Sequence, residues 1–177
     1  AAVMLVRLKG IDGDELQNNG STGGSWASPY LQAALDEGII TEQEKSAMEK
    51  NPGRYIQRQQ VAAWAAKVLE LEPDYGVGYQ LLRSFKDWQK INSEYAPYVA
   101  ASVREEIFSG STSGSFNPNA SISRGEMAAV LDRLSQRLAE DRGLVFAEGR
   151  VTGSETYWEE TPSGRKKKVE VMVQEST

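Results

Sequence analysis

The sequence predicts a mainly α-helical protein made of tandem helix–loop–helix repeats, followed by a short β-hairpin segment. The first observation is an internal repeat, because the passage at residues 110–134 has a weaker upstream copy that ends with residues 54–69. The second is that residues 28–35 align with residues 96–103 in the same order. The third is the strand-like alternation of the C-terminal part, interrupted by turn residues at 161–164. One such helical unit buries too little apolar surface alone, so we expect the repeats to pack on one another.

The alignment also fixes the register of the repeated helix. Arg58 falls on Arg124, and Lys67 falls on Arg133. The first eight residues reproduce the same helix, with Arg7 in the place of Arg133. We therefore expect four segments: the last helix of a truncated upstream repeat (1–10), a degenerate repeat (11–75), a well-matched repeat (76–140), and a β-hairpin segment or the start of a following module (141–177).

The composition excludes several function classes. A net charge of −5 and a pI near 5.0 leave no broad basic face for nucleic acid, apart from the local cluster at residues 165–168. The chain has no cysteine and no histidine, which removes thiolate nucleophiles, the usual general base and the commonest metal ligands. No stretch approaches the roughly 20 apolar residues that span a bilayer. We expect no metal, no cofactor, no nucleic acid partner and no membrane span.

Local signals mark the ends of the predicted helices. Ser28 is a favourable N-cap with Pro29 at the first helical position, and the apolar spacing that follows stops at Gly38. Residues 41–50 are strong helix formers with few apolar anchors, so a short helix is expected there. Trp64 lies on the apolar stripe of the next helix and is expected in the core.

The first turn of the best-preserved helix contains a residue that helix stability does not explain. Ser123 and Glu126 stand three apart ahead of an apolar periodic run, which is the capping-box arrangement. Arg124 lies between them, and a cation in the first turn opposes the helix macrodipole. Since Arg58 occupies the same position in the upstream copy, two interpretations stay open. Each arginine binds an anionic ligand, or each forms a salt bridge with a neighbouring carboxylate.

Other candidate sites give weaker signals. The loop at residues 110–119 is rich in glycine, serine and asparagine, but it lacks the lysine of a phosphate loop and the carboxylates of a calcium loop. Its glycines are expected to permit a turn, with Phe116 holding the loop to the core. Trp26 and Trp88 stand near helix boundaries, where a tryptophan either stacks on a sugar ring or fills the core. No two carboxylates stand in a recognisable catalytic arrangement, so no catalytic residue is assigned.

A longer motif runs through residues 83–139 and combines an aromatic–acidic start, a helix end, a glycine loop and an arginine motif: Phe85, Asp87, Ile107, Phe108, Gly110, Gly114, Phe116, Pro118 and the run Ser123-Arg124-Gly125-Glu126. This segment resembles an S-layer homology domain, in which the last motif reads threonine–arginine–alanine–glutamate. Residues 26–72 resemble the same family more faintly. There the motif reads Gln57-Arg58-Gln59-Gln60, and residues 41–53 replace the glycine loop.

The resemblance implies a fold and a function. Such domains occur in threes as a three-pronged pseudo-trimer, part of which we expect here, and their grooves hold a pyruvylated secondary polysaccharide attached to peptidoglycan. It implies an exported protein of the cell wall or S-layer that is anchored without covalent linkage and is not itself an enzyme, with a catalytic module beyond residue 177 left open. A guanidinium group suits the carboxylate of a pyruvyl ketal. We expect ligand contacts from six residues: Arg124, Arg58, Ser123, Gly110, Asp87 and Trp26.

A second function class stays open beside the first. The degenerate first repeat and the apolar helix at residues 1–8 also fit a helical-repeat module for protein interaction or self-assembly, without carbohydrate binding. In that case the helix at residues 1–8 is expected to swap into another chain.

Overall fold

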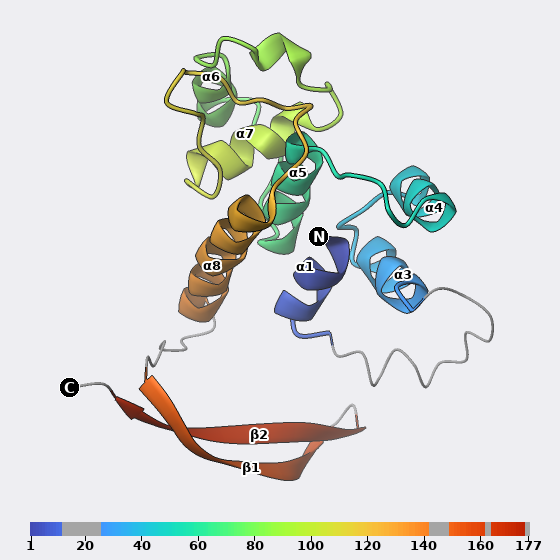
Figure 1. The fold of residues 1–177 in the computed structure, drawn as a ribbon, viewed down its shortest axis with the longest axis vertical. Helices are drawn as coiled ribbons and strands as arrows, with labels where there is room; N and C mark the ends of the chain where they lie inside the picture. Colours follow the sequence, from blue (N-terminus) through green and yellow to red (C-terminus); the bar gives the residue numbers. More distant parts are fainter. Residues whose placement is uncertain (12–25, 142–148, 162–163, 176–177) are drawn as a thin grey trace. The chain divides into compact units, whose positions relative to one another are not determined.

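The computed structural model describes residues 1–11, 26–141, 149–161 and 164–175. The chain divides into two units, residues 1–138 and 139–177. The first is helical and the second contains two strands, which confirms the predicted mainly α-helical fold with a C-terminal hairpin (Figure 1). The elements, in chain order, are α1 (Ala2–Leu8), α3 (Ser28–Asp36), α4 (Glu42–Lys50), α5 (Arg58–Val68), α6 (Val77–Leu82), the 3-10 helix Trp88–Lys90, α7 (Ala96–Arg104), α8 (Arg124–Asp141), β1 (Gly149–Thr161) and β2 (Gly164–Glu175).

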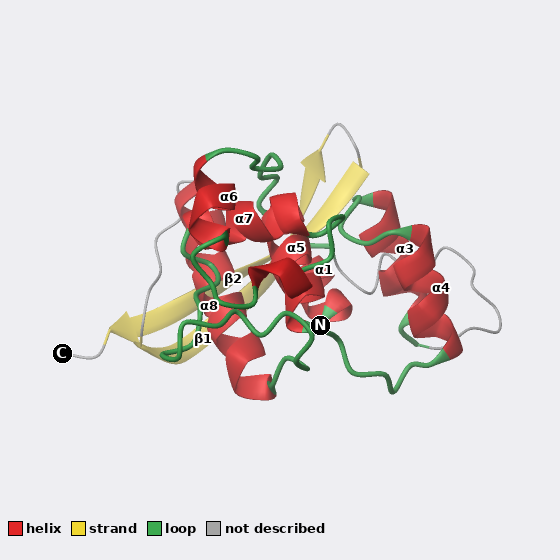
Figure 2. Ribbon diagram, turned by 90° about the horizontal axis from the view of Figure 1, so that it is seen from above, coloured by secondary structure: helices red, strands yellow, loops and turns green. Residues whose placement is uncertain are grey.

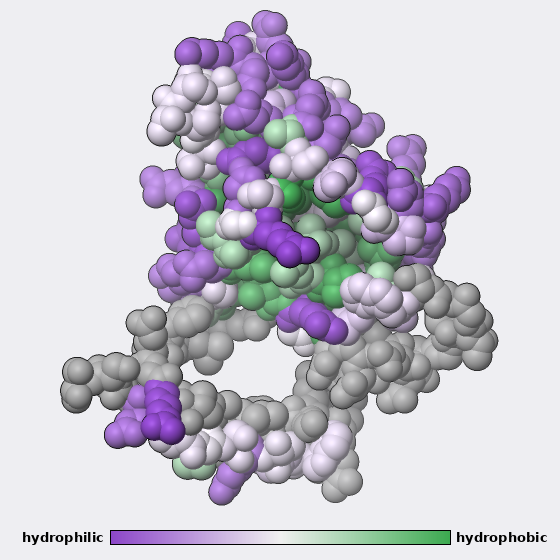
Figure 3. Space-filling view, viewed as in Figure 1, coloured by the Kyte–Doolittle hydropathy of each residue, from purple (hydrophilic) through white to green (hydrophobic). Residues whose placement is uncertain are grey.

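Helix α5 forms the centre of the helical unit. Figures 1 and 2 both place it between the α3–α4 pair and the α6–α7 pair, and it packs against α1 and α7. Every residue from Gln59 to Ala66 is buried, and Trp64 is fully buried, as its apolar stripe predicts. In Figure 3 apolar residues gather in the region of α1 and α5, with hydrophilic residues around them. The core is therefore shared between the two repeats.

Helix α1 packs inside this chain. Leu5 and Val6 are fully buried, and the helix lies against α3 and α5. Arg7 donates from Nη2 to the hydroxyl of Tyr30 at 2.8 Å and lies over the tyrosine ring. Met4 of the same helix is 49% exposed. Self-association through this helix stays a prediction.

The boundaries of α3 follow the sequence signals to within one residue. Gly38 follows α3 with φ +67°, where it stops the helix as its sequence position predicts. The helix begins one residue earlier than expected, because Ala27 takes a helical conformation (ψ −18°) and acts as N-cap in place of Ser28. Such boundaries commonly shift by one residue.

Helix α4 fills the place that the glycine loop occupies in the second repeat. Thr41 and Glu44 cap it reciprocally, since Glu44 N–H donates to Thr41 Oγ1 and Thr41 N–H donates to Glu44 Oε2. The buried carboxylate of Glu44 also accepts hydrogen bonds from Trp64 Nε1 at 3.0 Å and from the hydroxyl of Tyr95 at 2.8 Å. Burial, followed by the hydrogen bond to Glu44, raises the pKa of Tyr95 to about 12. Glu44 thus joins α4, α5 and the second repeat.

The C-terminal unit is an antiparallel hairpin. Strand β1 pairs with β2 from Gly149 opposite Glu175 to Thr161 opposite Gly164, with one irregularity between Val151 and Gly153. The turn residues 162 and 163 lie outside the described residues. The strand pair itself is the hairpin that the alternation predicted.

Candidate functional site

The two arginine-motif segments run side by side at the junction of the repeats. Arg58 N–H donates to the carbonyl of Ala120 at 2.8 Å, and Gln59 N–H donates to that of Pro118 at 3.1 Å. The first N–H groups of a helix have no partner within the helix. The second repeat supplies partners here, which explains why the weak capping residue Gln57 suffices at the start of α5.

The side chain of Arg58 crosses from the first repeat into the second. Its Nη1 lies 2.5 Å from Glu126 Oε1, and its Nη2 donates to the carbonyl of Ser109 at 2.8 Å. The guanidinium carbon lies 5.2 Å from the ring centre of Phe108 and 5.3 Å from that of Phe116. Two hydrogen bonds and two aromatic rings therefore fix the guanidinium plane.

The loop that receives Arg58 is held in shape by Asp87. The carboxylate of Asp87 accepts hydrogen bonds from the backbone N–H groups of Phe116 at 2.7 Å and Asn117 at 2.8 Å. A Cβ on Gly110 would stand 2.3 Å from the ring of Phe85. Glycine at 110 therefore lets the Phe85 ring lie directly on the loop backbone.

An open groove of about 360 Å³ lies beside Arg58. Arg58 and Arg133 both line it, and Glu126 is the one carboxylate among the described residues that do so. The pKa of Arg58 is lowered, chiefly by burial. The negative charge of Glu126 raises this pKa, and the positive charge of Arg133 lowers it. Since an arginine stays protonated in any case, the groove has two positive charges and one negative charge.

Glu126 has two roles in this groove. It completes the capping box of α8, with Ser123 N–H donating to its Oε2 at 2.8 Å and its own N–H donating to Ser123 Oγ at 3.2 Å. The Ser123 hydrogen bonds, and then the Arg58 guanidinium, lower the pKa of Glu126. Its carboxylate is therefore charged near neutral pH and shares Arg58 with any incoming anion.

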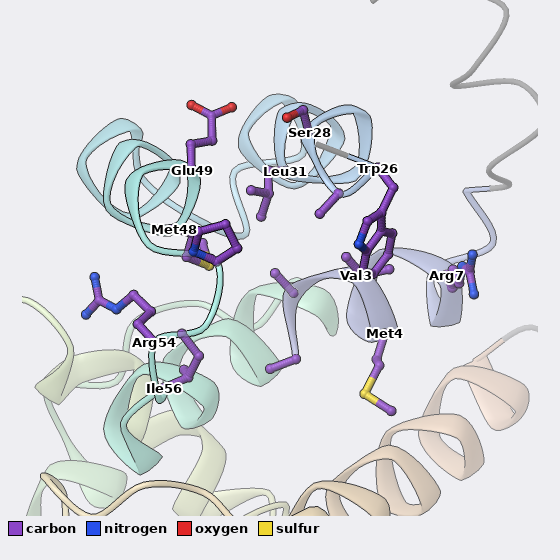
Figure 4. Close-up of a pocket in the computed structure, with 14 residues that line it drawn as sticks. Val3, Met4, Arg7, Trp26, Ser28, Leu31, Met48, Glu49, Arg54 and Ile56 are labelled. Atoms are coloured by element: carbon purple, nitrogen blue, oxygen red, sulfur yellow. The ribbon is translucent and has the colours of Figure 1, made fainter. Parts of the chain in front are cut away.

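Trp26 lies at a different cavity. This cavity measures about 820 Å³ and is formed by α1, α3, α4 and the segment before α5. Figure 4 shows the indole of Trp26 beside Val3 of α1, with Arg54 on the other side of the opening. The indole is 73% exposed, so it is accessible, but Trp26 and Arg58 line different cavities.

The six predicted ligand residues thus separate into four groups, of which Trp26 at its own cavity is one. Arg58 and Gly110 line the groove, whereas Ser123 and Asp87 hold its walls through hydrogen bonds to the backbone. Arg124, the counterpart of Arg58, is exposed, and its side chain makes no hydrogen bond or ion pair with any residue that the structure describes.

Arg133 is the groove residue that sequence reasoning missed. Its Nη1 donates to the carbonyl of Ile107 at 2.9 Å, which uses one of the five N–H donors of the guanidinium. The sequence did contain a signal for Arg133, because a cation recurs at this position of the repeated helix, as Arg7, Lys67 and Arg133. Arg7 lies over Tyr30 of α3, and Lys67 lies over Tyr98 of α7, the corresponding helix of the next repeat.

Among the described residues, no group of three acidic side chains stands close enough to hold a metal ion. In the same part of the chain, no helix combines the length and apolar character that a bilayer crossing requires.

Comparison with known proteins finds a matching family for part of the second repeat. Residues 84–128 match the S-layer homology domain family. An endoglucanase of Bacillus sp. (strain KSM-635) is 29% identical over 154 residues, which cover 86% of this chain and 16% of the endoglucanase. The Surface-layer 125 kDa protein of Lysinibacillus sphaericus is 32% identical over 106 residues, which cover 60% of this chain and 8% of that protein. No solved structure gives a significant match.

The matched residues include two parts of the groove wall, whereas Arg58 and Arg133 lie outside them. The loop held by Asp87 and the cap formed by Ser123 and Glu126 fall inside them. Residues 84–128 of this chain therefore match the S-layer homology domain family, as their motifs predicted.

Proposed function

We propose that this chain anchors a surface protein to the bacterial cell wall by binding an anionic, pyruvylated secondary polysaccharide in the groove beside Arg58. The observation that supports this most directly is the pair of guanidinium groups, Arg58 and Arg133, that line one open groove with a single carboxylate. A site with an excess of positive charge favours an anionic ligand.

The chemistry of a pyruvyl ketal fits this groove. Its carboxylate accepts charge-assisted hydrogen bonds, and guanidinium groups donate them in a planar fork. Arg58 is pre-oriented by Ser109 and two aromatic rings, so little side-chain freedom is lost on binding. Arg133 has N–H donors beyond the one that Ile107 accepts.

The comparisons support a role at the cell surface in general terms. One relative is a surface-layer protein, and the matched family is named for surface layers. The chain spans at most 16% of the length of these two relatives. The catalytic activity named for the endoglucanase is therefore not proposed for this chain, which acts as a non-catalytic anchor.

Binding to purified cell-wall sacculi tests the proposal. The protein should bind sacculi that carry the secondary polysaccharide, and extraction of that polymer with hydrofluoric acid should abolish binding. Sacculi from cells unable to add the pyruvyl ketal should bind about 10–100-fold more weakly, the range expected for hydrogen bonds to a charged group. Undiminished binding to extracted sacculi would refute the polysaccharide as ligand, and undiminished binding without the ketal would refute the role of its carboxylate.

A further inference from the structure

A second groove adjoins the one beside Arg58. It measures about 590 Å³ and shares four lining residues with the first: Phe108, Ser109, Gly110 and Arg133. Both grooves lie within the same helical unit. The two hollows therefore meet along the loop at Gly110 and the side chain of Arg133.

The second groove differs in chemistry from the first. Apolar side chains of Leu81, Phe85 and Val103 line it, and Leu81 is 44% exposed. Glu106 is its one carboxylate among the described lining residues. An apolar wall beside a hydrogen-bond acceptor suits a pyranose ring, which has a C–H face and several hydroxyl donors.

The backbone at Glu106 is unusual. Its φ of 59° lies in the left-handed region, where glycine is favoured. The equivalent residue of the first repeat is Gly38, with φ +67° at the same helix end. The second repeat thus has a glutamate at a position where glycine serves the backbone better.

Two other described non-glycine residues have a left-handed backbone, Glu70 and Asn117. Glu70, with φ 55°, forms an ion pair with Lys9 at 3.1 Å. Asn117, with φ 59°, donates its N–H to Asp87 and is of a residue type that tolerates this region. The backbone N–H of Glu106 donates to the carbonyl of Val103 at 3.1 Å, but its side chain makes no hydrogen bond or ion pair with any residue that the structure describes.

We infer that the second groove is a binding subsite for the neighbouring sugar of the same polysaccharide, with Glu106 accepting hydrogen bonds from its hydroxyl groups. This inference rests on the proposed function. Because the two grooves are continuous, a polysaccharide bound in the first would extend into the second. The groove beside Arg58 binds the sugar that carries the pyruvyl ketal, and the second groove binds the next sugar of the polysaccharide. Backbone strain at Glu106 is retained for this contact.

The test compares binding and stability of the same variants. Glu106→Gly removes the carboxylate and relieves the backbone, so it should raise Tm by about 2–4 °C and weaken binding to intact sacculi about tenfold. Glu106→Gln, which keeps the length of the side chain, should weaken binding with little change in Tm. Glu94→Gln, an exposed acid elsewhere in the same repeat, is the matched control and should change neither.

Each outcome decides the inference. Unchanged binding in both Glu106 variants would overturn it, and so would weaker binding accompanied by a lower Tm, because Glu106 would then act through the fold. The proposed function fails separately, if the wild-type protein does not bind sacculi or if Arg58→Ala binds as well as wild type. If the Glu106 variants bind sacculi as well as wild type while Arg58→Ala binds more weakly, only the second subsite is contradicted.

Discussion

Arg58 and Arg124 occupy equivalent positions in the two repeats, yet their surroundings differ. Arg58 lies against the loop of the following repeat, pairs with Glu126 and lines a groove. Arg124 begins α8 in the same way but is exposed, and its side chain makes no hydrogen bond or ion pair with the described residues. The motif therefore does not form a site by itself, because the site also requires the loop of a neighbouring repeat.

The sequence left two interpretations of each arginine open, an anionic ligand or a salt bridge, and at Arg58 they do not exclude each other. Arg58 does form a salt bridge, with Glu126, and it also faces an open groove with a second cation. The structural and ligand-binding roles are therefore compatible at one residue. Arg124 stays a predicted ligand contact whose site needs a further repeat opposite it.

The largest expected effect comes from the junction that holds the two repeats together. Glu44→Ala removes the acceptor of Trp64 Nε1 and the Tyr95 hydroxyl, which leaves buried donors without partners. We expect the free energy of unfolding to fall by about 3 kcal/mol, measured by urea denaturation. Glu42→Ala, an exposed acid of the same helix, is the control and should cost little. A cost below about 1 kcal/mol for Glu44→Ala would mean that the junction does not depend on this carboxylate.

The next effect concerns the loop that distinguishes the Arg58 site. Asp87→Asn replaces a carboxylate that accepts two backbone N–H groups with an amide that has one acceptor oxygen. We expect a loss of about 2 kcal/mol in stability and faster amide exchange at Phe116 and Asn117. Asp132→Asn, on the exposed face of α8, should leave both unchanged. If the loop amides stay protected in Asp87→Asn, the loop is held by other contacts.

How much of this was predictable depends on the range of the interaction. Helix ends, the Ser123–Glu126 cap and the hairpin depend on residues close in sequence, so periodicity and turn residues identify them. The helix at α4 was predictable for the same reason, but the burial of Glu44 was not, since its donors come from other elements. A charged helix with few apolar anchors gives no local sign of a buried acid.

The candidate site was predicted only in part. Arg58 was identified because an arginine that opposes the helix dipole stands at the same position in both repeats, as Arg58 and as Arg124. Its partner Glu126 was interpreted as a cap alone, because a local pattern cannot show that a first-turn acid also contacts an arginine of another repeat. The arrangement of cavities, which separates Trp26 from Arg58, follows from tertiary packing and has no local signature.

A smaller effect is expected from the second cation of the groove. Arg133→Ala should weaken binding to sacculi by about 3–10-fold, the range of one ordinary hydrogen bond, because one of its donors already serves Ile107. Raising the ionic strength should narrow the difference between variant and wild type, since exposed charges are screened by salt. A difference that is absent at low salt would remove Arg133 from the site.

The smallest expected effect is a change in the pKa of Glu126. It distinguishes Arg58 from Arg124 in the absence of any ligand. Because the pKa of Glu126 in the folded state lies below its usual value, its contribution to stability is present above that usual value, near 4.5, and is lost as pH falls through the folded-state pKa. Arg58→Ala should move the pKa of Glu126 part of the way up, since the larger Ser123 contribution remains. Arg124→Ala should leave it unchanged. Carboxyl NMR titration measures both, and equal shifts in the two variants would contradict the ion pair.

The most direct test of the central claim is the affinity of Arg58→Ala and Arg124→Ala for intact sacculi, measured side by side. We expect a loss of about 10–100-fold for Arg58→Ala and less than about twofold for Arg124→Ala in this chain. Arg58→Lys should recover only part of the loss, because an ammonium keeps the charge but not the planar fork. Equal losses at the two arginines, or no loss at Arg58, would contradict a site formed by one repeat's arginine on the next repeat's loop.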